Sequence, residues 1–221
     1  MSSSGMSRGG RCKIASRLNA SAAAAAAAVS GRPRRVEYDE EEPAREPRYH
    51  VFINHRGVDT KRTVARLLYD RLAVSRRIRA FLDNMSMRPG DRLEDRISAA
   101  ITDCAVAVAI FSPHYCDSEY CLRELAMLVE SRKIIIPIFY DIKPSDLVLP
   151  QAVVESTAHH PRDIERFKFA LREVKNTVGL TYDSATGDLA ELVSSAANAV
   201  LERMEESKIT QGRPAMIMSR L

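Results

Sequence analysis

The stretch from Ala105 to Phe111 constrains the fold more than any other part of the chain. It is a short, continuously apolar run, partly β-branched, and it leads directly into a polar turn and a helical pattern. Such a run is typical of a central parallel strand that is buried on both faces. In open α/β sheets, ligands bind in the crevice outside the carboxyl ends of such strands. The segment that follows, residues 112–125, is therefore the first candidate for a functional site.

This following segment is expected to open a helix. Ser118 or Asp117 can cap it, and its apolar residues recur on one face, namely Leu122, Leu125, Ala126 and Val129. Glu124 lies off the centre of that face, within about two turns of the helix start, so its carboxylate can reach a ligand in the crevice. The residues alone leave a second interpretation open, which is an ordinary exposed glutamate stabilised by the helix dipole.

Strand and helix patterns alternate along residues 48–205 and predict a parallel sheet with helices on both faces. Further strands are expected near residues 49–53, 78–83, 134–139 and 180–182, and helices near residues 59–74, 91–104, 118–129, 162–177 and 188–204. Pro137 suggests an edge or irregular position for its strand. Residues 84–90 are expected to form a loop with a turn at Gly90. Asp91 and Glu94 have capping-box spacing, and Leu93 is expected to be buried.

Charge is distributed unevenly along the chain. Residues 1–35 carry seven Lys and Arg and no acid, whereas residues 36–47 carry six acids and one Arg. The remainder is nearly neutral and lacks the electrostatic footprint of a dedicated nucleic-acid binder. Large apolar residues are nearly absent from residues 1–47, which we predict to be a disordered tail before a domain at 48–205. Residues 206–221 are predicted to be a flexible tail.

Both tails resemble targeting signals. The basic, acid-free start of the chain resembles an organelle transit peptide, which would direct the protein to a plastid. The end of the chain, Ser219-Arg220-Leu221, has the form of a peroxisomal address. Cytoplasm is the default expectation, and peroxisome and plastid are the alternatives.

The four cysteines form no C-x-x-C pair, and His114, Cys116 and Cys121 lack a fourth ligand at any usual spacing, so we expect no metal site. The sequence contains no secretory or transmembrane run, which favours reduced cysteines and no membrane contact. It also contains neither a dinucleotide-binding glycine motif nor a P-loop. Any nucleotide must therefore be held differently.

Four sequence blocks in order resemble the plant-type TIR (Toll/interleukin-receptor homology) domain of plant immune receptors. They are residues 49–60, 84–92, 111–125 and 137–145. The resemblance implies a flavodoxin-like five-stranded parallel sheet. It also implies a stand-alone member of the family, because the chain leaves no room for the ATPase and leucine-rich-repeat parts of a full receptor.

Many plant TIR domains cleave NAD⁺, and the resemblance implies that Glu124 is the catalytic residue. The products would be nicotinamide and either ADP-ribose or a cyclic isomer, with NAD⁺ as substrate and no cofactor. Gly90, Ser118 and Tyr120 match positions near the substrate. The family's first NAD-contacting segment falls on Asn54, His55, Arg56, Gly57, Val58 and Asp59. From the residues alone, Gly57 and Gly90 could serve turns, Ser118 a cap and Tyr120 the core.

The chain departs from the usual family pattern at several positions. Asn54 and His55 replace Ser-Phe, Val58 replaces Glu, and Tyr120 replaces Trp. The Ser-His pair through which members self-associate falls at Arg66 and Leu67. The expected partners are NAD⁺, further copies of the chain and other TIR-containing immune receptors, with nucleic acid as a lesser alternative. The competing function is a non-catalytic adaptor that acts through TIR–TIR contacts.

Overall fold

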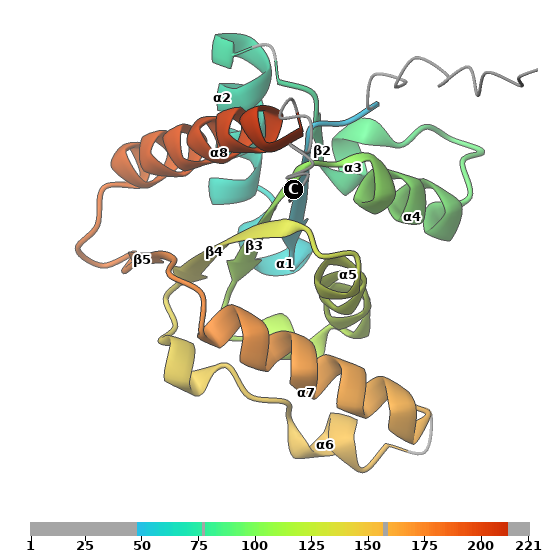
Figure 1. The fold of residues 1–221 in the computed structure, drawn as a ribbon. Coiled ribbons are helices and arrows are strands. Elements are labelled where there is room, and N and C mark those ends of the chain that lie inside the picture. The colour runs from blue at the N-terminus through green and yellow to red at the C-terminus, as the bar shows by residue number, and fades with distance from the viewer. Residues whose placement is uncertain (1–47, 77, 157–158, 212–221) are drawn as a thin grey trace, which may run out of the picture. The chain divides into compact units, whose positions relative to one another are not determined.

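The structure is a computed structural model that describes residues 48–76, 78–156 and 159–211. The predicted tail at residues 1–47 and the last ten residues lie outside this part. Its centre is an all-parallel five-stranded sheet with the order β2-β1-β3-β4-β5 (Figure 1). The strands are β1 (Val51–His55), β2 (Ala80–Phe81), β3 (Val106–Phe111), β4 (Ile134–Tyr140) and β5 (Leu180–Tyr182). The predicted flavodoxin-like sheet, with the apolar run as its central strand, is confirmed.

Helices cover both faces of this sheet. The longer ones are α2 (Val64–Arg76), α4 (Leu93–Asp103), α5 (Glu119–Glu130), α7 (Pro161–Lys175) and α8 (Leu189–Gln211). The short ones are α1 (Gly57–Thr60), α3 (Asp83–Ser86), η1 (Tyr115–Asp117), η2 (Pro144–Asp146) and α6 (Gln151–Val154). Figure 1 shows α2 and α8 on one side of the sheet and α5 and α7 on the other.

The two-residue period of β3 explains this layering. Val106, Val108 and Ile110 point to one face and pack with residues of α2 and α8. Ala109 and Phe111 point to the other face and pack with residues of α5 and α7. All six residues of β3 are buried, so the strand has to be apolar on both faces.

The first helix differs from its predicted course. A helix was expected from residue 59 to 74 with Asp59 or Thr60 as its cap, but a turn separates α1 from α2. The Asp59 carboxylate instead binds Arg56 and Ser112. Thr60 is buried, and its hydroxyl donates to the carbonyl of Arg56 at 3.2 Å. These contacts hold the chain after β1 in a compact loop.

The predicted capping box at α4 is wrong. Arg92 occupies the N-cap position, and no side chain caps the helix. The carboxylate of Asp91 instead accepts a 2.9 Å hydrogen bond from the backbone N–H of Arg88 and forms an ion pair with Arg96. Leu93 is 43% exposed, so its predicted burial is wrong as well. The segment before it contains the short helix α3, where a loop was expected.

Pro137 does not mark an edge strand. It lies in β4, which is paired with β3 on one side and with β5 on the other. Pairing with β5 begins only at Ile138, opposite Leu180. The proline, which has no N–H to donate, therefore precedes this short ladder, and the interior strand tolerates it.

Candidate active site

Helix α5 carries Glu124 beside the carboxyl end of β1. The predicted cap is confirmed, because the Ser118 hydroxyl accepts a 3.4 Å hydrogen bond from the backbone N–H of Cys121. Leu122 and Leu125 on either side of Glu124 are fully buried against the sheet. The Glu124 side chain, which lies off that apolar face, is partly buried and turned toward β1.

The partner of this carboxylate is the amide of Asn54, in β1. Asn54 Nδ2 donates to Glu124 Oε2 at 2.8 Å and lies 3.4 Å from the carbonyl oxygen of Cys121. On the other side of the amide, the Tyr115 hydroxyl donates to Asn54 Oδ1. Both Asn54 and Tyr115 are fully buried. The site thus rests on a buried hydrogen-bond chain that joins η1, β1 and α5.

This environment shifts the titration of Glu124. Burial raises the pKa of its carboxyl to about 7, the hydrogen bond from Asn54 opposes the shift, and the negative charge of Asp83 adds to it. A carboxyl group beside a cavity whose pKa is raised to near 7 is a recurrent feature of catalytic sites. With this pKa, Glu124 can gain or lose its proton within the physiological pH range.

The loop after β1 forms a second polar cluster. Arg56 Nη1 binds Asp59 Oδ1 at 2.7 Å, and the Ser112 hydroxyl donates to Asp59 Oδ2 at 2.5 Å. Ser112 directly follows β3, so this contact ties the ends of two neighbouring strands together. The guanidinium keeps its remaining N–H groups for other acceptors, such as a phosphate.

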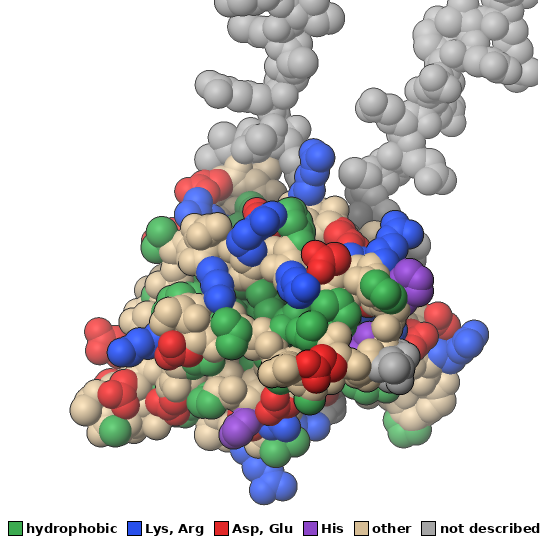
Figure 2. Space-filling model, turned by 90° about the horizontal axis from the view of Figure 1, so that it is seen from below, with side chains coloured by type: hydrophobic (Ala, Val, Ile, Leu, Met, Phe, Trp, Pro, Cys, Tyr) green, Lys and Arg blue, Asp and Glu red, His purple; other side chains and the backbone are tan. Residues whose placement is uncertain are grey.

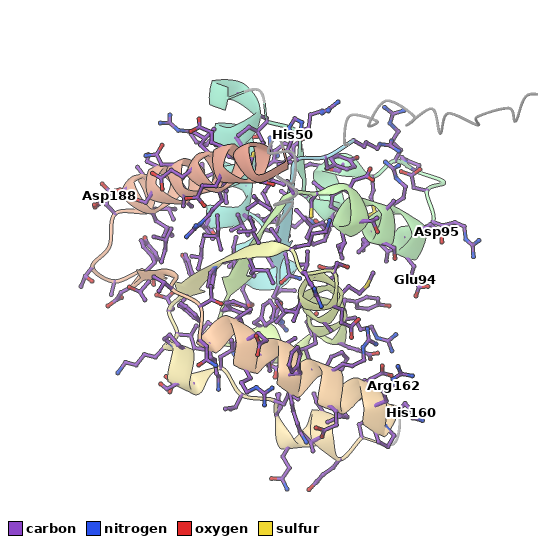
Figure 3. All side chains as sticks on the ribbon, viewed as in Figure 1. His50, Glu94, Asp95, His160, Arg162 and Asp188 are labelled. Carbon is purple, nitrogen blue, oxygen red and sulfur yellow. The ribbon has the colours of Figure 1, made fainter. Side chains whose placement is uncertain are left out.

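Two cavities meet at the start of α5. One, of about 870 Å³, is lined by residues of the first loop and of α5, including Arg56, Val58, Asp59 and Ser118. The other, of about 380 Å³, lies between α4 and α5 and is lined in part by Glu124. Tyr120 lines both cavities. The rim of the smaller cavity includes Glu94, at the start of α4 (Figure 3).

This arrangement can be compared with known proteins. A family model described as "TIR domain" matches residues 48–215. The chain belongs to the TIR family. The resemblance expected from the four sequence blocks is thereby confirmed.

Its relatives include one of matching length. The probable 2' cyclic ADP-D-ribose synthase BdTIR of Brachypodium distachyon is 70% identical, and the alignment covers 100% of both proteins. TMV resistance protein N of Nicotiana glutinosa is 32% identical over an alignment covering 59% of this chain and 12% of that protein. A TIR-domain chain in the structure of the activated Roq1 resistosome is 27% identical with a TM-score of 0.62, covering 69% of this chain and 99% of that one.

Within this TIR domain, the sequence-predicted site residues divide into groups. Glu124 and Tyr120 line the smaller cavity. The residues of the first loop and of the helix start that line the larger one are Arg56, Gly57, Val58, Asp59, Ser118 and Tyr120. Tyr120 is 64% exposed, which rules out core packing. Val58 is 88% exposed and is available for contact.

Other predicted residues lie elsewhere. His55 is 7% exposed, its Nε2 atom has no hydrogen-bond partner, and burial lowers the pKa of its imidazole. His55 is not among the residues that line the two cavities. Gly90 has a φ of 93°, in the region that favours glycine, so a turn is one reason for its presence. It lines neither of the two cavities.

Three residues of the site were not predicted. Asp83, whose charge acts on Glu124, is the second residue after β2, so its place near the carboxyl end of a strand could have identified it. Ser112 directly follows β3, so its place at the carboxyl end of a strand could have identified it as well. Tyr115 gave no signal of its own, because it lies in a polar turn and its burial becomes visible only once η1 is folded.

The described residues offer neither a metal site nor a membrane-spanning helix. Over residues 48–76, 78–156 and 159–211, no group of three or more His, Cys, Asp and Glu side chains could hold a metal ion. In the same part of the chain, no helix is long and apolar enough to cross a bilayer. Figure 2 shows acidic and basic side chains interspersed on the face that it presents.

Proposed function

We propose that the chain cleaves NAD⁺ and joins the two riboses of the remaining ADP-ribose into a 2' cyclic isomer. The observation that carries this proposal is the Glu124 carboxylate, which lines a cavity at the carboxyl end of the sheet. Support comes from the 70% full-length identity to a probable 2' cyclic ADP-D-ribose synthase. NAD⁺ enters as substrate, and the scheme needs no further cofactor.

The chemistry requires stabilisation of positive charge more than proton donation. The bond between ribose C1 and the pyridinium nitrogen breaks, and its electron pair leaves with neutral nicotinamide. The positive charge moves to an oxocarbenium-like ribose, which the ionised carboxylate of Glu124 stabilises. A 2'-hydroxyl of the same molecule then adds to C1 and releases a proton, giving the cyclic product. Addition of water instead gives linear ADP-ribose.

The residues around the two cavities take distinct roles in this proposal. Glu124 faces the reacting ribose from the smaller cavity. The Arg56 guanidinium, held by Asp59, offers N–H groups to the diphosphate in the larger cavity. Tyr120, which borders both, offers an aromatic face for stacking. One extended dinucleotide would thus bridge the two cavities.

Incubation of the purified protein with NAD⁺, at high concentration or with a crowding agent, followed by chromatography of the nucleotides, tests the proposal. The wild type is expected to consume NAD⁺ and to form a product that co-elutes with a 2' cyclic ADP-ribose standard. Glu124→Ala is expected to do neither. Glu130→Gln is the matched control, because Glu130 ends the same helix and binds Arg166 outside both cavities. No consumption by folded, self-associated wild type would favour the adaptor function.

The proposal also covers the protein partners of the chain and the compartment in which it acts. The Roq1 resistosome contains TIR domains, which supports self-association of this chain and contact with other TIR-containing receptors. At the position of the family's Ser-His pair, α2 presents Arg66, which forms an ion pair with Asp70, and Leu67, which is 45% exposed. Self-association through this helix would therefore use a charged and an apolar side chain in place of Ser and His. We place the activity in the cytoplasm. A fluorescent fusion that leaves Leu221 free distinguishes this from import into peroxisomes, and a fusion that leaves Met1 free distinguishes it from import into plastids.

A further inference from the structure

The hydrogen-bond chain behind Glu124 begins at a tyrosine that does not line either cavity. Tyr115 is fully buried, and its hydroxyl contacts Asn54 Oδ1 and, at 3.1 Å, the carbonyl oxygen of Cys121. The hydroxyl has a single proton, which it donates to Asn54 Oδ1, the nearer of the two oxygen atoms. Burial, followed by the nearby charges, raises the pKa of Tyr115 well above its ordinary value, so the phenol keeps the proton that it donates.

This donation fixes the orientation of the Asn54 amide. An amide can be turned by 180°, which exchanges its oxygen and nitrogen atoms. The turned amide would place Oδ1 against Glu124 Oε2 and the carbonyl oxygen of Cys121, which are acceptors. It would also force the Tyr115 hydroxyl proton from Asn54 to the longer contact with the Cys121 carbonyl. Tyr115 and the Cys121 carbonyl thus both favour the orientation in which the amide N–H points at Glu124.

The orientation matters because an amide N–H and an amide oxygen favour opposite states of a carboxyl group. An N–H donor stabilises the carboxylate, whereas an oxygen acceptor stabilises the protonated acid, which can donate to it. A freely turning Asn54 would accommodate either state. An amide whose N–H is held toward Glu124 binds the carboxylate more strongly than the protonated acid, which offers only a neutral acceptor oxygen.

We propose that Tyr115 and Asn54 form a positioning pair that holds the Glu124 carboxyl in its ionised form, facing the reacting ribose. This inference rests on the proposed NAD⁺ cleavage for its role in turnover, although the effect on the proton of Glu124 is independent of substrate. Neither Tyr115 nor Asn54 needs to touch NAD⁺.

Other groups around Glu124 act on its proton too. The titratable or charged side chains that surround it or share its cavity are Asp83 of α3, Glu94 of α4, Tyr115 of η1, and Glu119, Cys121 and Arg123 of α5. Asp83 favours the protonated acid by repulsion, whereas Glu119 and Arg123 bind each other. Because burial and the charge of Asp83 both favour the protonated acid, the hydrogen bond from Asn54 is the contact that favours the carboxylate.

The first test follows the proton of Glu124 by NMR, without substrate. Protein labelled with ¹³C at the glutamate carboxyl is titrated, and the Glu124 signal is assigned by its loss in Glu124→Gln. Tyr115→Phe and Asn54→Leu are each expected to raise the midpoint by about one pH unit or more, the size of a hydrogen bond to a charged group. Tyr182→Phe is the matched control, since Tyr182 lies in β5 and its hydroxyl donates to the carbonyl of Gly187. Its Glu124 midpoint is expected to equal that of the wild type.

The second test follows turnover of NAD⁺ against pH in the same proteins. In Tyr115→Phe the acid limb of kcat is expected to move up by the same amount as the NMR midpoint, with recovery of activity at high pH and an unchanged KM. A merely structural role would lower kcat equally at every pH. An unchanged NMR midpoint in both folded variants would overturn the positioning pair. A shifted midpoint in the variants, together with a wild type that cleaves no NAD⁺, would instead overturn the proposed function and leave the pair standing.

Discussion

Asn54 and Glu124 lie 70 positions apart in the chain, and the amide of one donates a 2.8 Å hydrogen bond to the carboxylate of the other. The contact joins the carboxyl end of β1 to the second turn of α5. It lies in a partly buried site where desolvation favours the protonated acid. The hydrogen bond favours the carboxylate and desolvation favours the acid, and the balance between them sets the pH at which Glu124 ionises.

Cleavage of NAD⁺ is expected to increase with pH through a midpoint near 7. Stabilisation of the ribose cation requires the ionised carboxylate, and burial raises the pKa of Glu124 to about 7. Steady-state rates measured between pH 5 and pH 9 check this expectation. A rate that is flat across this range would show that another group limits the reaction.

Glu124→Gln is expected to stabilise the folded protein above neutral pH. The pKa of Glu124 is about 7 in the folded state against an ordinary value of 4.5, so the folded state binds the proton more tightly than the unfolded chain. The resulting stability is fully present below pH 4.5 and is lost as pH rises through 7. At pH 8 the free energy of unfolding of Glu124→Gln should therefore exceed that of the wild type by on the order of 2 kcal/mol, which corresponds to roughly 4–8 °C in Tm. At pH 4 the two proteins should unfold at similar temperatures.

Thermal unfolding of Glu130→Gln provides the contrast for this measurement. Glu130 accepts hydrogen bonds from Arg166 at 2.6 and 2.8 Å, and these bonds lower the pKa of its carboxyl. Its contribution to stability is present above the ordinary pKa and is lost as pH falls. At pH 8, Glu124→Gln should thus raise Tm and Glu130→Gln should lower it. Equal changes in Tm would refute the raised pKa of Glu124.

Tyr120→Ala is expected to raise KM for NAD⁺ about tenfold, whereas Tyr120→Trp should leave it near the wild-type value. The ring is 64% exposed and borders both cavities, so its removal costs little stability but takes away a stacking surface. Aromatic pairs are worth roughly 1 kcal/mol beyond their buried area. KM and Tm measured for both variants check this. A large loss of stability in Tyr120→Ala would show that the side chain supports the fold instead.

The sequence predicted the layers of this fold because β3 is apolar on both faces and the helices carry regular apolar spacing. It also placed Glu124 and Asn54 at the same edge of the sheet, since the loops after parallel strands share that edge. The hydrogen bond between them could not be predicted. It depends on the register of β1 against β3 and on the rotation of α5, which no local pattern specifies.

The errors have a similar origin. Pro137 was expected at an edge or irregular position because a proline lacks an N–H, but the cost depends on where β5 begins, and that is decided by a segment about 40 residues later. Asp91 and Asp59 had the spacing of caps, yet both carboxylates found arginine partners in the folded chain. In each case a tertiary contact overrode a local preference.

Gly179→Ala is expected to destabilise the protein, although the residue is outside both cavities. A Cβ atom there would lie 2.5 Å from the carbonyl oxygen of Pro137 and 2.9 Å from the ring of Phe139. Because the oxygen belongs to the backbone of β4, the start of β5 would have to move away from its partner strand. Overpacking of this kind typically costs about 1–3 kcal/mol. Gly57→Ala is the matched control for stability, since its Cβ would meet its nearest neighbour at 3.8 Å. Urea unfolding should separate the two, and equal midpoints would mean that β5 is not held against Pro137 as closely as the structure indicates.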